Sequence, residues 1–244
     1  MVRPRTTALL LAAALGCGAP ERGPAPLMNA PAIPALDAAA PARTETATFA
    51  LGCFWCPDAQ FGILPGVVRT RVGYAGGTTE NPTYHDLGDH TECVQIDYDP
   101  ATLSFDQVLE RIWTAHNPCV RTEYKQYRNA IFYVDEAQRK AIEASKDRKE
   151  AELGKSIKTV ILPLTRFTVA EDYHQKYELR CTEGLIEEFK AIYPDPKDLC
   201  NSTAAARVNG YIAGRGTREQ FQAEADRLGL SPEGRKRLEI YVLK

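Results

Sequence analysis

The sequence lacks the features that would place it in several common protein classes. None of its apolar runs reaches the roughly 18–20 residues that a bilayer-spanning helix needs. The net charge is only -2 and no basic stripe stands out, so we expect no nucleic-acid partner. No internal repeat is present. With 244 residues, 44% hydrophobic and 25% charged, the chain is instead that of an ordinary globular protein, long enough for one good core.

The N-terminus has the pattern of an export signal. Two arginines precede an apolar stretch over 8–15, and small residues follow. The motif Ala-Leu-Gly-Cys ending at Cys17 also resembles a bacterial lipobox, which would make Cys17 the lipidated first residue of the mature chain. We therefore expect residues 1–17 to be a signal peptide with a lipobox, and the protein to be a periplasmic lipoprotein. Ordinary cleavage nearby and a retained apolar N-terminus are the alternatives.

The remaining chain divides into three parts by composition. Residues 18–45 are rich in alanine and proline and cannot bury a core, so we expect a semi-stiff linker. Residues 46–198 mix strand and helix patterns and form the expected main domain. Residues 199–244 contain helix caps but no recognisable chemistry, which predicts a small helical extension used for packing or docking.

Strand and helix patterns in the main domain do not alternate regularly. Period-two or short apolar patterns predict strands over 46–52, 66–77, 91–100, 129–134 and 158–164. Capping residues and helical spacing predict helices from Ser104, Asp135 and Ala170. This order predicts an α+β fold rather than a doubly wound sheet.

The stretch Gly-Cys-Phe-Trp-Cys-Pro over 52–57 suggests a reactive thiol. Pro57 is tolerated only in the first turn of a helix, so a helix should begin near Phe54. Cys53 then lies at or just before the helix start. Free backbone N–H groups at that end favour the thiolate, which is the nucleophilic form of cysteine.

The aromatic residues beside the thiol have two possible roles. Phe54 and Trp55 are adjacent, and adjacent helical residues cannot share one face. Both could belong to the core, but we expect at least one to lie near the surface and to form an apolar wall for a small nonpolar group.

The strand predicted over 91–100 carries a carboxylate on its apolar face. Its alternation places Glu92 on the same face as Val94, Ile96 and Tyr98. A carboxyl group on a buried face needs a hydrogen-bonding partner or a chemical role.

Several motifs together resemble the A type of the peptide methionine sulfoxide reductase family, in family order over about 46–179. They are GCFW from Gly52, GYAGG over 73–77, NPTY over 81–84, Glu92 before the V-x-I-x-Y-D-P strand, QYRNAIFY over 126–133 and AEDYHQKY over 170–177. The extension carries AAARVNGYIAG over 204–214, which resembles a divergent, plant-like branch of the same family.

The resemblance implies a function, a fold and a set of roles. Such enzymes reduce the S epimer of methionine sulfoxide, free or in proteins, and their fold is a two-layer α/β roll (ferredoxin-like) with a mixed sheet. Cys53 would be the nucleophile, and Phe54 and Trp55 would hold the substrate methyl group. The sulfoxide oxygen would be contacted by Glu92, Tyr74 and Tyr127. We expect a monomer without cofactor or metal, regenerated by an external dithiol such as thioredoxin.

A second thiol must resolve the sulfenic acid that this chemistry leaves on the nucleophile. Family members usually have glycine at position 56, but here Cys56 completes a Cys-x-x-Cys motif that could close a disulfide. We therefore predict Cys56 as the resolving cysteine, with Cys200 and Cys181 as the next candidates. If Cys17 carries lipid, six of the seven cysteines remain, an even number in a compartment that permits disulfides.

The chain departs from the family in one loop. The family's Gly-Asn-Asp-x-Gly-Thr segment before Gln-Tyr-Arg is missing, and Cys-Val-Arg-Thr-Glu-Tyr-Lys over 119–125 takes its place. The usual aspartate aligns near Thr122, so Glu123 could substitute for it. This departure affects the expected rate and substrate preference rather than the reaction type.

Three other interpretations remain open from the sequence. The Cys53-x-x-Cys56 motif could belong to a general thiol-disulfide oxidoreductase, although no thioredoxin-like pattern surrounds it. A zinc site could be formed by Cys53, Cys56, His116 and Cys119, although about sixty residues separate the two halves. The altered loop could also indicate a binding module derived from the enzyme.

Overall fold

The structure, a computed structural model, describes residues 32–243. The expected signal peptide, the expected lipidation site Cys17 and the first part of the expected linker over 18–45 lie outside the described residues. Within the described range, no helix combines the length and the apolar character needed to cross a membrane.

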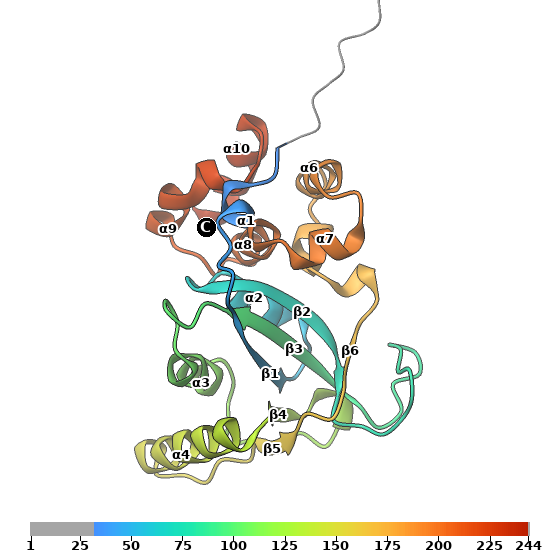
Figure 1. The fold of residues 1–244 in the computed structure, drawn as a ribbon, viewed down its shortest axis with the longest axis vertical. Coiled ribbons are helices and arrows are strands. Elements are labelled where there is room, and N and C mark those ends of the chain that lie inside the picture. The colour runs from blue at the N-terminus through green and yellow to red at the C-terminus, as the bar shows by residue number, and fades with distance from the viewer. Residues whose placement is uncertain (1–31, 244) are drawn as a thin grey trace, which may run out of the picture. The chain divides into compact units, whose positions relative to one another are not determined.

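One six-stranded mixed sheet forms the centre of the fold, with the strand order β5-β4-β1-β3-β2-β6 (Figure 1). The strands are β1 (Glu45–Leu51), β2 (Val67–Ala75), β3 (Thr91–Tyr98), β4 (Asn129–Tyr133), β5 (Val160–Pro163) and β6 (Phe167–Val169). Neighbouring strands are antiparallel except β4 and β5, which are parallel. The α+β class and the mixed sheet predicted from the sequence are thus confirmed.

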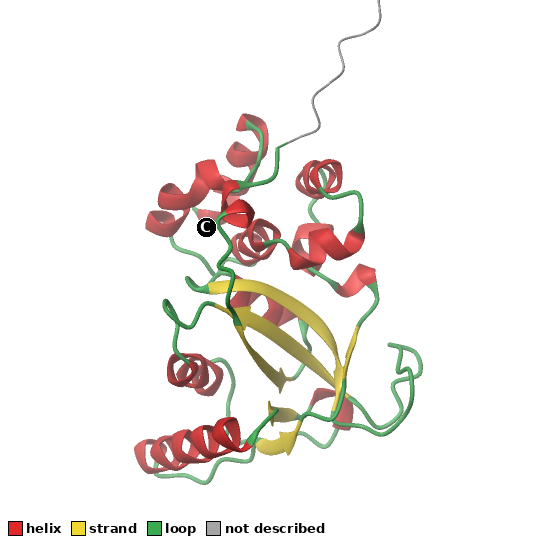
Figure 2. Cartoon of the chain, viewed as in Figure 1, coloured by secondary structure: helices red, strands yellow, loops and turns green. Residues whose placement is uncertain are grey.

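Helices surround the sheet and make up most of the chain after β6 (Figure 2). The α-helices are α1 (Ala35–Ala38), α2 (Trp55–Gly62), α3 (Phe105–Thr114), α4 (Glu136–Leu153), α5 (Tyr177–Arg180), α6 (Leu185–Ile192), α7 (Pro196–Asn201), α8 (Thr203–Ile212), α9 (Arg218–Glu224) and α10 (Pro232–Val242). The 3₁₀ turns are η1 (Lys125–Tyr127), η2 (Asp172–His174) and η3 (Ala225–Arg227). The C-terminal region is helical, as predicted.

Local capping chemistry sets several helix starts. Ser104 Oγ accepts the Gln107 backbone N–H at the start of α3, and Gln107 Oε1 accepts the Ser104 backbone N–H, which completes a capping box. The Asp135 carboxylate caps α4 by accepting the Gln138 backbone N–H. Ser231 caps α10, whose first residue is Pro232. These three starts were predicted because each depends on only four neighbouring residues.

Two apolar cores lie on either side of α2. One fills the space between the sheet and helices α2, α3 and α4, and includes Phe49 and Phe61 with ring centroids 4.4 Å apart. The other joins α5 to α10 and includes Phe189 and Tyr211. Helix α2 is therefore shared between the sheet domain and the helical region.

The contact between α2 and α8 depends on two glycines. A Cβ atom on Gly62 would lie 2.8 Å from the carbonyl oxygen of Ala206 in α8. A Cβ atom on Gly210 of α8 would lie 2.8 Å from the carbonyl oxygen of Ala59 in α2. Because neither backbone can move away easily, larger residues would separate the helices.

Part of the expected linker is folded onto the helical region. Helix α1 lies within it, and β1 begins at its last residue. The Asp37 carboxylate accepts hydrogen bonds from Tyr193 (2.6 Å), Ser202 Oγ (2.8 Å) and the backbone N–H groups of Thr203 and Ala204 at the start of α8. Asp37 thereby satisfies N–H groups that a helix start leaves free.

The helix predicted from Ala170 does not begin there. The chain forms the short turn η2 and then α5, separated by Lys176 in a left-handed conformation with φ 54°. Lys176 keeps this unfavourable conformation while its backbone N–H and its ammonium group both contact the Asp58 carboxylate, at 3.1 and 3.3 Å. A contact between residues so far apart in sequence leaves no local pattern.

Candidate active site

Cys53 lies in the turn that joins β1 to α2. Gly52 has φ 84°, which glycine adopts without strain, and turns the chain at the end of the strand. Phe54 is the N-cap residue of α2, and Pro57 lies in the first turn, where its missing N–H is tolerated. Cys53 is half-buried and directly precedes the helix, where the sequence placed it.

The surroundings of Cys53 raise the pKa of its thiol, whereas the sequence predicted that the helix start would favour the thiolate. Backbone N–H groups of Trp55 and Cys56 lower the pKa of Cys53, as expected at a helix start. Burial is the larger effect, however, and together with the negative charge of Glu92 it raises the pKa of Cys53 above its ordinary value. A helix start alone therefore does not keep this thiol ionised.

Glu92 on β3 lies beside the nucleophile. Its side chain is 1% exposed. One carboxyl oxygen accepts a hydrogen bond from the Phe54 backbone N–H (3.1 Å), and the other accepts one from Gln126 Nε2 (2.8 Å). Burial raises the pKa of Glu92 despite these two hydrogen bonds. Glu92 is therefore suited to carry a proton that it can donate to a bound substrate.

Gln126 was not predicted as a site residue. It lies in η1, within the motif QYRNAIFY, directly before Tyr127. Its role could not be read from sequence, because an amide at this position shows its partner only once β3 is placed beside η1. The hydrogen bond orients the carboxyl group of Glu92 without adding a charge.

Two tyrosines complete the polar part of the site. Burial, the charge of Glu92 and a hydrogen bond with Tyr84 raise the pKa of Tyr127 to about 12, so its hydroxyl remains a donor at neutral pH. The hydroxyl of Tyr74 donates to Glu171 Oε2 at 2.8 Å. Tyr127 thus lies close to Glu92 and Cys53. The hydroxyl proton of Tyr74, in contrast, is already donated to Glu171.

Glu171 is a second acidic residue that the sequence did not reveal. Its other oxygen accepts a hydrogen bond from the Tyr84 backbone N–H at 3.0 Å. Burial opposes ionisation, but the hydrogen bonds from Tyr84 and Tyr74 outweigh it and the pKa of Glu171 is lowered. Glu171 therefore stays ionised and holds Tyr74 and the NPTY loop together.

Aromatic side chains form the apolar part of the site. Phe54 is 1% exposed and packs with Tyr74, with 6.0 Å between ring centroids. Trp55 is half-buried and stacks on Tyr177, with centroids 3.7 Å apart and an angle of 8° between the rings. One aromatic is thus buried and its neighbour lies nearer the surface. The buried His174 ring packs against both, at 5.0 and 5.8 Å.

The first turn of α2 is held by a buried polar network around Asp58. The carboxylate of Asp58 is completely buried and accepts hydrogen bonds from Thr70 Oγ1, from Lys176 and from Asn209 Nδ2. Asn209 Oδ1 also accepts the Leu179 backbone N–H at 3.1 Å. These contacts connect α2 with β2, α5 and α8, and so fix the helix that carries Cys53.

The three candidate resolving cysteines have different environments. Cys56 is exposed in the first turn of α2, three residues after Cys53. Cys181 is exposed at the end of α5 and forms a hydrogen bond with Tyr177, whose pKa also responds to the charge of Cys53. Cys200 is 5% exposed, and its thiol contacts Gln175 Oε1 at 3.3 Å. All three are free thiols in this structure.

The alternative zinc site is not assembled. Both ring nitrogens of His116 are occupied, one by the carbonyl oxygen of Ile112 and the other by Thr159 Oγ1, each at 2.8 Å. In the described part of the chain, no group of three or more histidine, cysteine, aspartate or glutamate side chains is arranged to hold a metal ion.

Comparison with known proteins agrees with this geometry. A family model described as peptide methionine sulfoxide reductase matches residues 45–193. The chain belongs to the peptide methionine sulfoxide reductase family. A second model, described as the helical domain of selenoprotein methionine sulfoxide reductase A, matches residues 195–238. The protein is therefore an A-type reductase with a C-terminal helical domain, and its activity is the reduction of peptide methionine sulfoxide.

Individual relatives show the same affiliation. A peptide methionine sulfoxide reductase of Drosophila melanogaster is 44% identical over 193 residues, covering 78% of this chain and 77% of its own. Peptide methionine sulfoxide reductase A5 of Oryza sativa subsp. japonica is 42% identical over 184 residues, covering 72% and 71%. The structure of methionine sulfoxide reductase A of Corynebacterium diphtheriae is similar with a TM-score of 0.51 and 32% identity, covering 65% of this chain and 86% of that one.

Proposed function

We propose that this reductase acts on the S epimer of methionine sulfoxide, free or in proteins, with Cys53 as nucleophile and Glu92 as proton donor. The observation that supports this most directly is the hydrogen bond from the Phe54 N–H to Glu92. It places a buried carboxyl group, whose pKa is raised, one residue from the reactive thiol. Tyr127 supplies a second hydroxyl donor for the sulfoxide oxygen, and Tyr74 a third once it leaves Glu171.

The chemical step transfers the oxygen from the substrate to the cysteine. The sulfur of Cys53 attacks the sulfoxide sulfur while Glu92 protonates the sulfoxide oxygen, which is a poor leaving group until it is protonated. The new S–S bond then breaks as the protonated oxygen moves to the Cys53 sulfur, so the substrate sulfur gains two electrons and leaves as methionine, while Cys53 loses two and becomes a sulfenic acid. The proton of the Cys53 thiol replaces the one that Glu92 donated. Phe54 and Trp55 provide the apolar contact for the substrate methyl group.

We propose that Cys56 resolves the sulfenic acid, and that Cys-Phe-Trp-Cys marks a branch of the family that uses this pair. The Cys56 thiol attacks the Cys53 sulfur, releases water and forms a disulfide across the first turn of α2. Exposure and proximity in sequence support Cys56. Cys181 is the next candidate because it is exposed and contacts Tyr177, whose pKa also responds to the charge of Cys53, whereas Cys200 would have to leave its buried position.

An external dithiol, of the thioredoxin type, would then reduce the disulfide. The exposed position of Cys56 supports this step, because an incoming thiolate needs access to one sulfur of the bond. We also propose that the enzyme works outside the cytoplasm, anchored through a lipid on Cys17. The mass of the N-terminal peptide of the mature protein tests this: a diacylglyceryl-modified Cys17 is expected, and an unmodified retained N-terminus would contradict it.

Turnover of separated epimers tests the proposed reaction. With dithiothreitol as reductant, the protein should reduce N-acetylmethionine S-sulfoxide and leave the R-sulfoxide unchanged. Equal turnover of both epimers would contradict the proposed specificity. Reduction of insulin disulfides at a rate comparable to sulfoxide reduction would instead favour the general thiol-disulfide oxidoreductase.

A single turnover without reductant tests the resolving cysteine. The reduced enzyme is mixed with one equivalent of the S-sulfoxide, alkylated and digested, and the disulfide-linked peptides are identified by mass spectrometry. A bond between Cys53 and Cys56 is expected. In a Cys56→Ser variant, a dimedone adduct should accumulate on Cys53. A bond between Cys53 and Cys181 or Cys200 in the unmodified protein would remove Cys56 from the role.

A further inference from the structure

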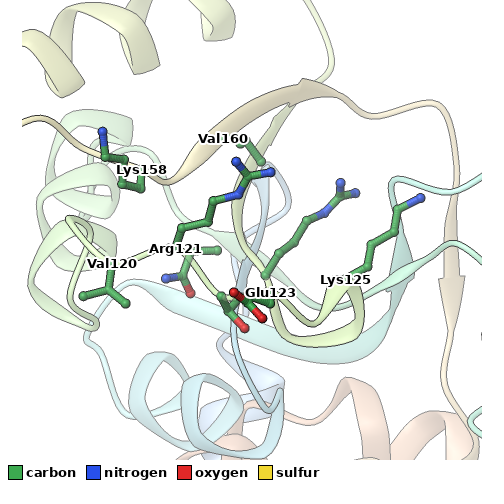
Figure 3. A pocket seen from close by; sticks show the side chains of 9 residues that line it. Val120, Arg121, Glu123, Lys125, Lys158 and Val160 are labelled. Atoms are coloured by element: carbon green, nitrogen blue, oxygen red, sulfur yellow. The ribbon is translucent and has the colours of Figure 1, made fainter.

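A hollow of about 350 Å³ lies beside the site, formed by the loop that departs from the family pattern. Its lining includes four cationic side chains, namely Arg121, Lys125, Arg128 and Lys158, and a single acidic one, Glu123. Arg121 extends toward Val160 of β5, with Lys158 and Lys125 on either side of it (Figure 3). We call this hollow the cationic pocket.

Three of the four cations in the cationic pocket have no ion-pair partner among the described residues. Lys125 has an acidic partner, Asp89, at 3.5 Å. Arg128 donates to the carbonyl oxygen of Gly76 at 3.0 Å, and its buried Nε atom has no hydrogen-bond partner among the described residues. Arg121, Arg128 and Lys158 form no ion pair with a carboxylate of the described residues, although Glu123 lines the same pocket and the charge of Asp89 also acts on Arg128. Such a group attracts an anion from outside.

The cationic pocket and the thiol lie at the same end of the sheet. Strands β1 and β4 pair Leu51 with Asn129, which lines the pocket, and Cys53 follows Leu51 by two residues. Paired strands lie about 5 Å apart and an extended chain covers about 3.5 Å per residue, so the Cα atoms of Asn129 and Cys53 lie within roughly 12 Å. Three or four residues of an extended peptide span that distance.

The turn η1 separates the two sites and contributes to both. Gln126 and Tyr127 face Glu92, whereas the residues before and after them, Lys125 and Arg128, line the cationic pocket. A peptide that binds with its oxidised methionine at Cys53 and runs along this turn would bring the residues next to that methionine close to the cationic pocket.

We propose that the cationic pocket binds an acidic side chain of the substrate polypeptide, about three positions from the methionine sulfoxide. The enzyme would then prefer oxidised methionines in acidic segments of proteins. Arginine guanidinium groups pair with carboxylates through two parallel hydrogen bonds, and the exposed Val120 and Val160 beside them can contact the methylene groups of a glutamate. This inference rests on the proposed function and specifies its substrate class.

Peptides with one methionine S-sulfoxide test the proposal. Acetylated and amidated peptides carry Glu, Gln or Lys three positions before and after the sulfoxide. At low salt, kcat/KM should be about five-fold higher with Glu than with Gln and lowest with Lys, mainly through KM. At 0.5 M salt the preference should shrink because the charges are screened. Equal kcat/KM for the three peptides at low salt would overturn the proposal.

Charge-reversal variants locate the preference. Arg121→Glu and Lys158→Glu should each reduce or invert the preference for the Glu peptide. Lys236→Glu, which makes the same charge change at an exposed position on α10, should retain it. If the preference persists in both pocket variants, the carboxylate binds elsewhere and the proposal fails. A further Gln peptide is made with a free C-terminal carboxylate instead of the amide. If only this peptide is preferred over the amidated Gln peptide, the pocket binds a chain terminus and not an acidic side chain, which contradicts the proposal.

An uncharged small substrate separates this proposal from the proposed function. N-acetylmethionine S-sulfoxide methylamide cannot reach the pocket, so the original protein and the two pocket variants should reduce it equally. If the original protein fails to reduce it, the proposed function is wrong, whatever the peptides show. If all three proteins reduce it equally but the peptides are not distinguished, only the cationic pocket loses its assigned ligand.

Discussion

The two ends of the segment 53–58, which leads into α2, differ sharply in how they are held. At the N-terminal end, Cys53 is half-buried, Cys56 is exposed and both thiols are free. At the other end of this segment, Asp58 is completely buried and contacts Thr70, Lys176 and Asn209. The reactive end and the fixed end are thus close in sequence, at the start of the eight-residue helix α2.

This difference shows how a short helix can serve redox chemistry. The thiol at residue 53 must meet a substrate, a second thiol and a reductant in turn, so its surroundings have to stay accessible. The direction in which it points must nevertheless be fixed, and an isolated helix of this length is unstable in water. The buried network at the other end supplies that direction. Changes at the first end should affect activity, and changes at the second should affect stability.

The largest expected effect is on activity, at the reactive end. Cys53→Ser should lower kcat/KM for the S-sulfoxide by about 10⁴-fold or more, because serine is a far weaker nucleophile at this position. The melting temperature should stay within about 2 °C of the original, since the buried network is unchanged. Residual turnover close to the original rate would show that another residue attacks the substrate.

The second expected effect is on stability, at the fixed end. Lys176→Met removes the only cation in contact with buried Asp58 among the described residues, and should cost about 3–5 kcal/mol of unfolding free energy. Lys190→Met, at an exposed lysine 3.9 Å from Glu187, should cost less than about 1 kcal/mol. Urea unfolding of both variants measures the difference. Equal costs would mean that the buried pair does not hold α2.

A third prediction links the two ends through charge. Glu92→Gln removes the proton donor and should lower kcat about 10²-fold. It also removes the negative charge that raises the pKa of Cys53. The pH at which iodoacetamide alkylates Cys53 at half its maximal rate should therefore move to lower values. If Cys53 is alkylated at lower pH in the variant while kcat falls, the role of Cys53 as nucleophile is distinguished from the role of Glu92 as proton donor. If the pH dependence of alkylation is unchanged, the charge of Glu92 does not raise the pKa of Cys53.

The smallest expected effect concerns the helical region. Asn209→Ala leaves the Leu179 N–H without its partner and removes one of the two hydrogen bonds to Asp58 Oδ2, and should cost about 1–3 kcal/mol. Thermal unfolding measures this loss, and kcat/KM at 25 °C should fall less than about three-fold in the folded fraction. A large loss of kcat without a loss of stability would instead show that α8 acts on the reactive end.

The sequence predicted features that depend on neighbouring residues. The alternation of β3 placed Glu92 on the face that packs against α2, and Pro57 placed Cys53 just before the helix. The helix caps at Ser104, Asp135 and Ser231 were also predictable. In each case the decisive signal lies within a few residues, because side-chain period and capping chemistry are local.

Features that depend on tertiary packing were not predictable in the same way. The pair formed by Asp58 and Lys176 joins residues 118 positions apart, and the partners of Gln126 and Glu171 lie on other elements. The net pKa of Cys53 depends on how deeply the thiol is buried, which no motif states. The cationic pocket likewise arises only when the loop at 119–125 meets β5.

The hydrogen bonds that Asp37 accepts determine how the protein would respond to mechanical force. A chain held at its N-terminus and pulled would first load the hydrogen bonds from Asp37 to Tyr193, Ser202 and the start of α8. Only after those had broken would tension reach β1, which leads directly to residue 53. The Asp37 hydrogen bonds therefore transfer a pulling force to the helical region before it reaches Cys53.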